Sequence, residues 1–396
     1  MILLKVEKFG TGFIDKNMET KGDFFVFPAF TDSHIHMRAL IASQYIVSID
    51  DENLIDELES SKNDIVIGRG WKKDFDPKIL EEIERPCIAV RICGHKAYCN
   101  EKFKKEFGLP SNVVTENDLV DLFVRLDELM LTEKYLKIAE NRLKKMGIYR
   151  IIDMGSTPKL AEILKKGELS YNLFFDLPYK DFVLKTGLKF GDKLNGNTKI
   201  LGIKIYLDGS LGARTAAMGN NKKNLNYTDS ELFKIMKEID ERNLAIAAHS
   251  IGDAAVHQFV SVFKNAKNTF HKIEHCQLVR EEDVDKLMNP GIQPYFYMSD
   301  RLWAREIENK SLFYPLKSLM KKKPLGGSDF PVEDFNVIRS IKTAVLRVDG
   351  EGIDIKSAVD MYTKNADSYL GETLDKQILI EDFYSDSPKI LGEIKI

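Results

Sequence analysis

FPAFTDSHIH, at residues 27–36, is an apolar, strand-like run that ends in two histidines separated by one residue. Side chains at positions i and i+2 of a strand project from the same face, so His34 and His36 can reach one ion. A bare His-x-His pattern is weak evidence on its own, because two histidines at a solvated strand end explain it equally well. The rest of the chain decides between these interpretations.

Three later segments repeat this pattern of an apolar run that ends in a metal-binding residue type. They are residues 245–249, 270–275 and 324–329, which end in His249, His275 and Asp329. Taken alone, an aspartate shortly before Pro331 could simply open a turn. However, Asp329 comes directly after the last of the eight strands that the sequence predicts, and this position favours a metal ligand instead.

A lysine, Lys204, lies inside a fourth apolar run at residues 200–208. A buried ammonium group is costly unless it is paired. Loss of its proton makes the amine nucleophilic toward carbon dioxide, and the resulting carbamate can bridge two metals. The alternative is that Lys204 extends to the strand end or forms an ion pair.

Taken together, the order His-x-His, Lys, His, His, Asp resembles the amidohydrolase superfamily. Residues 204–217, KIYLDGSLGARTAA, resemble the signature of amidohydrolase family 3, the branch that contains N-substituted formamide deformylases. Supporting motifs are Gly70-Trp71, GHKA at 94–97, HSIGD at 249–253, IEHCQ at 273–277, Gln293-Pro294 and GSDFPVE at 327–333. The resemblance covers about residues 24–370 of the 396-residue chain.

Short β-rich runs alternate with helical patterns along the chain, which indicates βα units and a parallel sheet. Eight barrel strands are predicted at residues 25–31, 148–154, 171–177, 199–207, 244–249, 269–275, 291–298 and 323–328. The clearest amphipathic helices are predicted at residues 133–145, 229–242 and 281–288. We therefore expect an α/β fold, a (β/α)8 TIM barrel, with its active site at the C-terminal ends of the strands.

The barrel domain is predicted to span residues 24–371 and to carry an insertion. Residues 38–145 are too long for an ordinary connection after strand 1, and strand-like runs at 64–71 and 87–92 predict an inserted lid subdomain. Residues 1–23 and 372–396 hold β-like runs at 2–6 and 377–380, and in amidohydrolases such termini pair into a small β-sandwich. The family's Gly-x-x-Ala-Asp segment is not recognisable after Leu374, which predicts a reduced sandwich.

The resemblance implies a metal centre with a defined ligand set. It assigns His34, His36 and Asp329 to one metal, His249 and His275 to the other, and carboxylated Lys204 to the bridge. Zinc, one or two ions per chain, is the expected cofactor, although other divalent transition metals suit the same ligands. A water shared by the metals would become a hydroxide nucleophile, with Asp329 as general base and then general acid.

Four residues are predicted to contact substrate. Asp208 and Arg214 lie in the loop that follows Lys204, where Arg214 either contacts substrate or pairs with Asp208. The resemblance also places His95 and Trp71 near the substrate. Without it, a lone histidine is more often structural and a tryptophan beside a turn is commonly a core residue.

The expected function is metal-dependent hydrolysis of a carbon–nitrogen bond, other than a peptide bond, in an amide, a formamide or a cyclic amide. One alternative is a ring deaminase that binds a single metal and leaves Lys204 uncarboxylated. Another is a non-catalytic, metal-stabilised binding protein, which would not need the intact ligand set. Residues 295–298 and Trp303 predict either an aromatic wall for the substrate or core positions.

Composition excludes several partners. The formal net charge is -3, so no basic surface is expected that would bind nucleic acid or an acidic membrane. The first residues lack a signal-peptide core, and no stretch of about 20 apolar residues could span a bilayer. We expect a cytoplasmic protein that acts on a small-molecule substrate, and the resemblance leaves a homodimer open.

Overall fold

The computed structural model describes residues 7–8, 24–92, 95–219, 222–301 and 312–394. The chain divides into two compact units. The first comprises Met1–Met37 and Glu140–Ile396, and the second comprises Arg38–Ala139, within the predicted insertion at 38–145. Helices α1 (Met37–Ala42) and α5 (Glu133–Lys145) cross the two boundaries.

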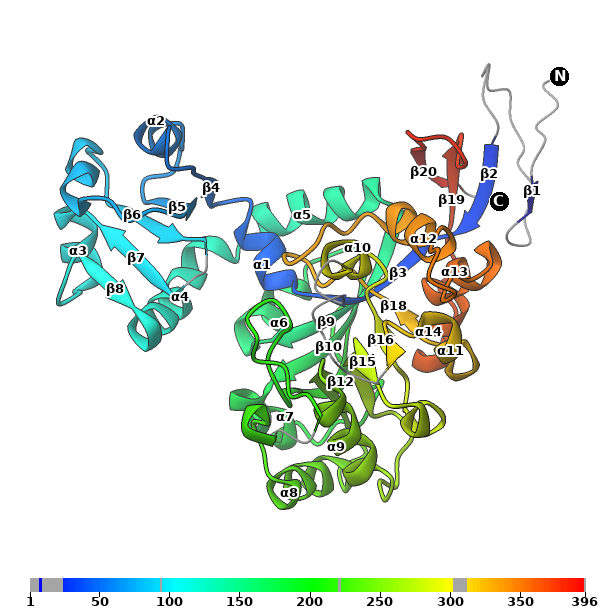
Figure 1. Cartoon of the computed structure of the whole chain (residues 1–396). Helices are drawn as coiled ribbons and strands as arrows, with labels where there is room; N and C mark the ends of the chain where they lie inside the picture. The colour runs from blue at the N-terminus through cyan, green and yellow to red at the C-terminus, as the bar shows by residue number, and fades with distance from the viewer. Residues whose placement is uncertain (1–6, 9–23, 93–94, 220–221, 302–311, 395–396) are drawn as a thin grey trace, which may run out of the picture. The chain divides into compact units, whose positions relative to one another are not determined.

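The first unit is a barrel of parallel strands with helices between them, as predicted (Figure 1). Its strands, in spatial order, are β3 (Phe30–Ile35), β9 (Ile148–Ser156), β10 (Ser170–Asp176), β12 (Thr198–Tyr206), β13 (Ala245–Ser250), β14 (Lys272–His275), β16 (Gly291–Ile292) and β18 (Leu325–Gly326). The short β11 (Lys193–Asn195) pairs antiparallel with β12. The last strand lies beside the first, because Ser33 Oγ donates to the Gly326 carbonyl at 2.7 Å and the Asp329 N–H donates to the His34 carbonyl at 2.6 Å.

The connections between the barrel strands are mostly helical. The helices in these connections are α6 (Pro158–Leu164), α7 (Lys180–Lys185), α8 (Asp229–Asp240), α9 (Asp253–Phe263), α10 (Phe296–Asp300) and α11 (Leu316–Leu319). Three more helices follow the last barrel strand: α12 (Val337–Val345), α13 (Ile355–Met361) and α14 (Lys364–Leu370). Thr228 and Glu231 begin α8 with a capping box, which satisfies backbone N–H groups at its first turn. The predicted helix at 281–288 is a 3-10 helix, η4 (Glu281–Lys286).

Four predicted barrel strands differ from the observed ones. Those predicted at 269–275 and 323–328 are shorter in the structure, where they are β14 and β18. The run at 25–31 divides between β2 (Phe24–Pro28), which leaves the barrel, and β3. The prediction of a strand at 291–298 was wrong beyond Ile292, because residues 296–300 form α10. Pro294 cannot donate a hydrogen bond to a neighbouring strand, which explains why the strand ends before it.

Strands from both chain termini pair into one small sheet in the order β1 (Glu7–Lys8), β2, β19 (Gln377–Glu381) and β20 (Lys389–Ile394). β19 pairs antiparallel with both β2 and β20, so the predicted strand at 377–380 is confirmed. Among the described residues, the expected reduced sandwich takes the form of this single sheet. The predicted run at 2–6 lies outside the described residues.

The second unit has a sheet of its own. Its strands, in order, are β4 (Val47–Ser48), β5 (Val66–Trp71), β6 (Cys87–Arg91), β7 (Lys96–Cys99) and β8 (Val113–Thr115). Its helices are α2 (Leu54–Glu59), α3 (Glu101–Phe107) and α4 (Glu116–Met130), with the 3-10 helix η1 (Pro77–Glu82). β5 and β6 confirm the two strands predicted for the insertion.

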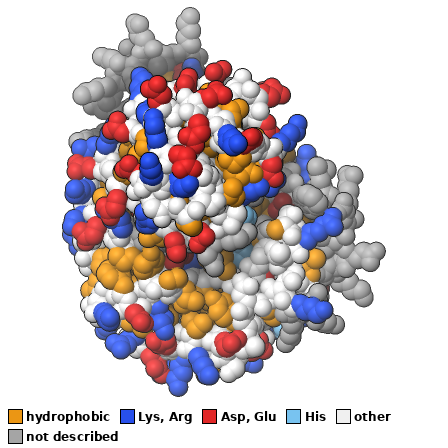
Figure 2. All heavy atoms as spheres, turned by 90° about the vertical axis from the view of Figure 1, so that its left-hand side faces the viewer, with side chains coloured by type: hydrophobic (Ala, Val, Ile, Leu, Met, Phe, Trp, Pro, Cys, Tyr) orange, Lys and Arg blue, Asp and Glu red, His pale blue; other side chains and the backbone are white. Residues whose placement is uncertain are grey.

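Basic and acidic side chains are interspersed over the face of the molecule in Figure 2. That mixture agrees with a formal net charge of only -3. Within the described residues, no helix has both the length and the apolar character needed to cross a bilayer.

Candidate metal centre

The predicted ligands all lie at or near the C-terminal ends of barrel strands. His34 is on β3 and His36 directly follows it, and Lys204, His249 and His275 lie on β12, β13 and β14. Asp329 lies three residues after the end of β18. Because the C-terminal ends of parallel strands share one rim of the barrel, side chains that are distant in the sequence meet there.

Asp329 joins the two histidines of the first motif. Its Oδ1 lies 3.2 Å from His34 Nε2 and 3.1 Å from His36 Nε2. Burial opposes its ionisation, but the charge of His34 and hydrogen bonds from both histidines hold the pKa of Asp329 well below its usual range. The carboxylate is therefore ionised, the form that binds a metal or accepts a proton.

His249 and His275 lie next to each other, with ring centroids 4.5 Å apart, and His275 is 4.8 Å from the ring of His34. Burial and the nearby charge of Lys204 lower the pKa of His249 to about 4, and burial holds the pKa of His275 well below its usual value. Both imidazoles are therefore neutral at pH 7, as metal ligands must be.

Hydrogen bonds fix the orientation of three imidazoles. Nδ1–H of His34 donates to Glu274 at 2.8 Å, and Nδ1–H of His275 donates to Gln293 at 2.9 Å. Nε2–H of His249 donates to the Gly209 carbonyl at 2.9 Å. Each of these hydrogen bonds occupies one ring nitrogen and so orients the ring, an arrangement typical of metal sites, while the second nitrogen of His34 faces Asp329 at 3.2 Å.

Lys204 is 1% exposed, and among the described residues its Nζ has no hydrogen-bond partner. Burial lowers the pKa of its amine to about 8. Neither alternative from the sequence is seen, because the side chain does not reach solvent and forms no ion pair with a described residue. A buried polar atom without a partner is a site that a further group can complete.

A metal suits this set of residues. One donor atom each from His34, His275 and Asp329 lie within 4.8 Å of one another, close enough to share an ion. Imidazole nitrogens and a carboxylate oxygen are ligands that zinc and other divalent transition metals prefer.

The loop after β12 is anchored by Asp208 rather than left open. The Asp208 carboxylate is buried and accepts hydrogen bonds from the backbone N–H groups of Ala217, Ile251 and Gly252 at 2.8–3.0 Å. Burial raises its pKa to about 6. Since Gly209 of the same loop binds His249, Asp208 helps to position that histidine, and a contact with substrate stays a prediction.

Arg214 lies exposed in this loop, with a left-handed backbone conformation (φ +58°). It does not pair with Asp208, and its guanidinium has no ion-pair partner among the described residues. A contact between Arg214 and substrate stays a prediction.

The two site residues predicted in the insertion lie in the second unit. Trp71 is fully buried, its ring stacks on Tyr98 with centroids 5.0 Å apart, and its Nε1–H donates to the Ala89 carbonyl at 3.1 Å. His95 is exposed, between β6 and β7. Trp71 therefore serves the core of this unit, and the proximity of both residues to substrate stays a prediction.

Sequence reasoning missed two residues that contact this centre and one close to it. Glu274 and Gln293 accept hydrogen bonds from predicted ligand histidines. Asp153 on β9 is buried and accepts the N–H of Met37, the residue after His36, at 2.7 Å. Burial raises the pKa of Asp153 to about 6. A signal existed for Asp153, because it follows an apolar run in a predicted barrel strand.

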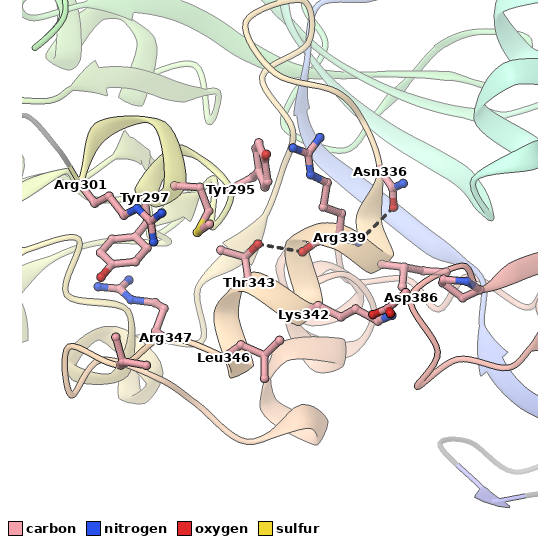
Figure 3. Close-up of a pocket in the computed structure, with 14 residues that line it drawn as sticks. Tyr295, Tyr297, Arg301, Asn336, Arg339, Lys342, Thr343, Leu346, Arg347 and Asp386 are labelled. Atoms are coloured by element: carbon pink, nitrogen blue, oxygen red, sulfur yellow. Dashed lines mark hydrogen bonds between the residues drawn. The ribbon is translucent and has the colours of Figure 1, made fainter.

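The predicted aromatic wall is divided between two places. Phe296 lies parallel to the ring of His275, with centroids 6.2 Å apart. Tyr295, Tyr297 and Met298 instead line a separate cavity of about 560 Å³ beside α12, and none of the predicted ligands lines it (Figure 3). Phe296 is therefore the residue of this run that stands next to the candidate metal centre, while Trp303 lies outside the described residues.

Known proteins resemble this chain in sequence and in structure. A family model described as amidohydrolase family matches residues 22–376. The putative amidohydrolase YtcJ of Bacillus subtilis (strain 168) is 23% identical over 448 residues, which cover 93% of this chain and 84% of that protein. An uncharacterised metal-dependent hydrolase from Pyrococcus horikoshii OT3 is structurally similar, with a TM-score of 0.77, 26% identity, and coverage of 88% of this chain and 82% of that one. One from Pyrococcus furiosus has a TM-score of 0.76 and 26% identity, covering 88% and 83%.

Proposed function

We propose, from the premise that the chain belongs to the amidohydrolase family, that it hydrolyses a carbon–nitrogen bond in an amide, a formamide or a cyclic amide. The observation that carries this proposal is the convergence of His34, His275 and Asp329 beside a buried lysine whose Nζ has no hydrogen-bond partner among the described residues. A binding protein would not need an ionised aspartate and an unpartnered lysine at the same place.

The ligand set that we propose is His34, His36, His249, His275 and Asp329, with Lys204 as a bridge once its Nζ has formed an N–C bond to carbon dioxide and lost a proton. Zinc is the proposed ion. When bound, such a metal polarises the scissile carbonyl and lowers the pKa of water. The low pKa of the Lys204 amine supports its carboxylation, because the reaction requires the neutral amine.

Asp329 is assigned the proton transfers. Its carboxylate is held ionised beside two histidines, so it can accept a proton from the attacking water. The same group then donates that proton to the leaving nitrogen as the carbon–nitrogen bond breaks. We further propose that Arg214 binds an anionic part of a small-molecule substrate, which its exposed guanidinium suits.

The test is metal content per chain, measured on protein produced with and without added zinc and bicarbonate. Hydrolysis of a library of N-acyl and N-formyl amines is followed in parallel, with Lys204→Ala as the variant. Two metals per chain that are lost together with activity in the variant support the proposal. One metal per chain and no response to bicarbonate favour a mononuclear ring deaminase, and a metal-loaded protein that is inactive on all amides and esters favours a binding protein.

A further inference from the structure

A second buried lysine lies in the barrel, and it belongs to an ion pair. Lys272 and Glu274 alternate on β14, so they face the same side, and both are 0% exposed. Lys272 Nζ donates to Glu274 Oε1 and lies 3.3 Å from the Ser33 carbonyl, and Glu274 Oε2 accepts from His34 Nδ1 at 2.8 Å. The three side chains form a chain of contacts from lysine to carboxylate to imidazole.

The neighbouring strand makes room for this pair. Gly291 on β16 is the register partner of Glu274, and a Cβ at this position would overlap both Glu274 Oε2 and Lys272 Nζ. A glycine in a strand interior is unfavourable unless another group approaches closely. Here the approaching group is the buried ion pair.

A purely structural explanation of the pair is weak. Burying two charges removes them from water, and an apolar pair of similar volume is often as stable or more stable. The remaining partner of Glu274 is His34, whose other ring nitrogen faces Asp329 at 3.2 Å. The Glu274 carboxylate therefore orients His34, a predicted metal ligand, through this hydrogen bond.

We propose that Glu274, held in place by Lys272, is a positioning residue that fixes the His34 imidazole with its Nε2 facing Asp329, where these two residues would hold the metal, and that the pair thereby sets metal affinity. A carboxylate that accepts the outer N–H of a ligand histidine orients the ring and raises its basicity. This inference rests on the proposed metal-dependent function, but it concerns binding and not turnover.

The experiment is a competition between a zinc chelator and the purified full-length protein, which gives the zinc dissociation constant without an activity assay. Glu274→Gln is expected to weaken zinc binding by about 10- to 100-fold. Because this variant leaves Lys272 buried without its partner, the double variant Lys272→Met/Glu274→Gln is measured as well. The double variant is expected to regain a melting temperature near that of the wild type while zinc binding stays weak.

Glu140→Gln is the matched control. Glu140 is a buried carboxylate that binds the Leu169 N–H at 3.0 Å and the Tyr171 hydroxyl, away from the candidate ligands. It should leave zinc affinity unchanged. The inference is overturned if the double variant binds zinc as the wild type does, or if Glu140→Gln weakens binding equally. A wild-type protein that binds no zinc would instead refute the proposed zinc centre.

Discussion

Two strands of the barrel, β12 and β14, each bury a lysine, and the contacts of the two side chains differ. On β12, Lys204 has no hydrogen-bond partner among the described residues, and its Nζ lies 5.2 Å from the Tyr206 ring centroid. On β14, Lys272 contacts Glu274, which contacts His34. Both lysines are at most 1% exposed. Burial is therefore the same for both lysines and lowers the pKa of both amines. What separates them is direct contact with a carboxylate, which Lys272 has and Lys204 lacks among the described residues.

Electrostatics explains why the two arrangements have different consequences. Burial makes an ammonium lose its proton more easily, and for Lys204 it lowers the pKa from 10.5 to about 8, although the charges of Glu274 and Asp329 oppose this shift. On β14, burial would raise the pKa of Glu274, but the charges of Lys272 and His34 lower it to about 2. The Glu274 carboxylate therefore stays ionised. Replacing each lysine by methionine should therefore change the free energy of unfolding in opposite directions at the two positions.

The largest expected effect is on catalysis. Lys204→Met removes the amine that we propose to be carboxylated, so hydrolysis should fall by more than the roughly 100-fold typical of residues that only orient a ligand. Lys272→Met should reduce hydrolysis less, because Glu274 can still contact His34. Initial rates and metal content of both variants, with and without bicarbonate, measure the difference. A Lys204→Met protein that keeps two metals and full activity would contradict the proposed bridge.

Stability of the metal-free protein should change in opposite directions. Lys272→Met leaves the Glu274 carboxylate buried without its cation and should lower the free energy of unfolding by about 3–5 kcal/mol. Lys204→Met removes an unpaired buried ammonium, and a pKa lowered from 10.5 to about 8 corresponds to a gain of roughly 3 kcal/mol at neutral pH. Urea unfolding of both variants in the presence of a chelator measures this. If both variants lose a similar amount of unfolding free energy, Lys204 has a stabilising partner after all.

The stabilisation by Lys204→Met should disappear at alkaline pH. The pKa of Lys204 is lower in the folded chain, about 8, than in the unfolded chain, so between about pH 8 and 10.5 the unfolded state binds more protons. Stability of the wild type therefore rises with pH across this window relative to the variant. Unfolding free energies of both proteins at pH 7, 8, 9 and 10 test this, and a difference that is constant with pH would refute the lowered pKa.

The fold could be predicted because each barrel strand is an apolar run in the sequence, and these runs can be recognised without knowing how the strands pair to close the barrel. The prediction was wrong at residues 291–298, where an apolar and aromatic run looks the same whether it is a strand or a helix. Pro294 was the signal in the sequence that the strand ends early. The helix α10 that follows it places the Phe296 ring parallel to the ring of His275. The terminal strands could be found, but their pairing depends on segments at opposite ends of the chain.

The site could be predicted in part for the same reason. His34, His249, His275 and Asp329 each end an apolar run, and Lys204 interrupts one, so these residues are visible in the sequence. Lys272 and Glu274 alternate with apolar residues, which is the pattern of a half-exposed strand. Only closure of the barrel brings Glu274 to His34, 240 positions away in the sequence, and shows that these charges face inward.

The smallest expected effect concerns the other acceptor beside a ligand histidine. Gln293 accepts from His275 Nδ1 as Glu274 does from His34, but its amide oxygen carries no charge. Hydrogen bonds to an ionised acceptor are about twice as strong as neutral ones, so Gln293→Met should weaken zinc binding by less than about tenfold. Gln258→Met is the control, because that buried amide donates to the Tyr227 carbonyl and to Asp229. If Gln293→Met weakens zinc binding as much as Glu274→Gln does, zinc affinity depends on the orientation of the imidazole ring and not on the charge of the Glu274 carboxylate.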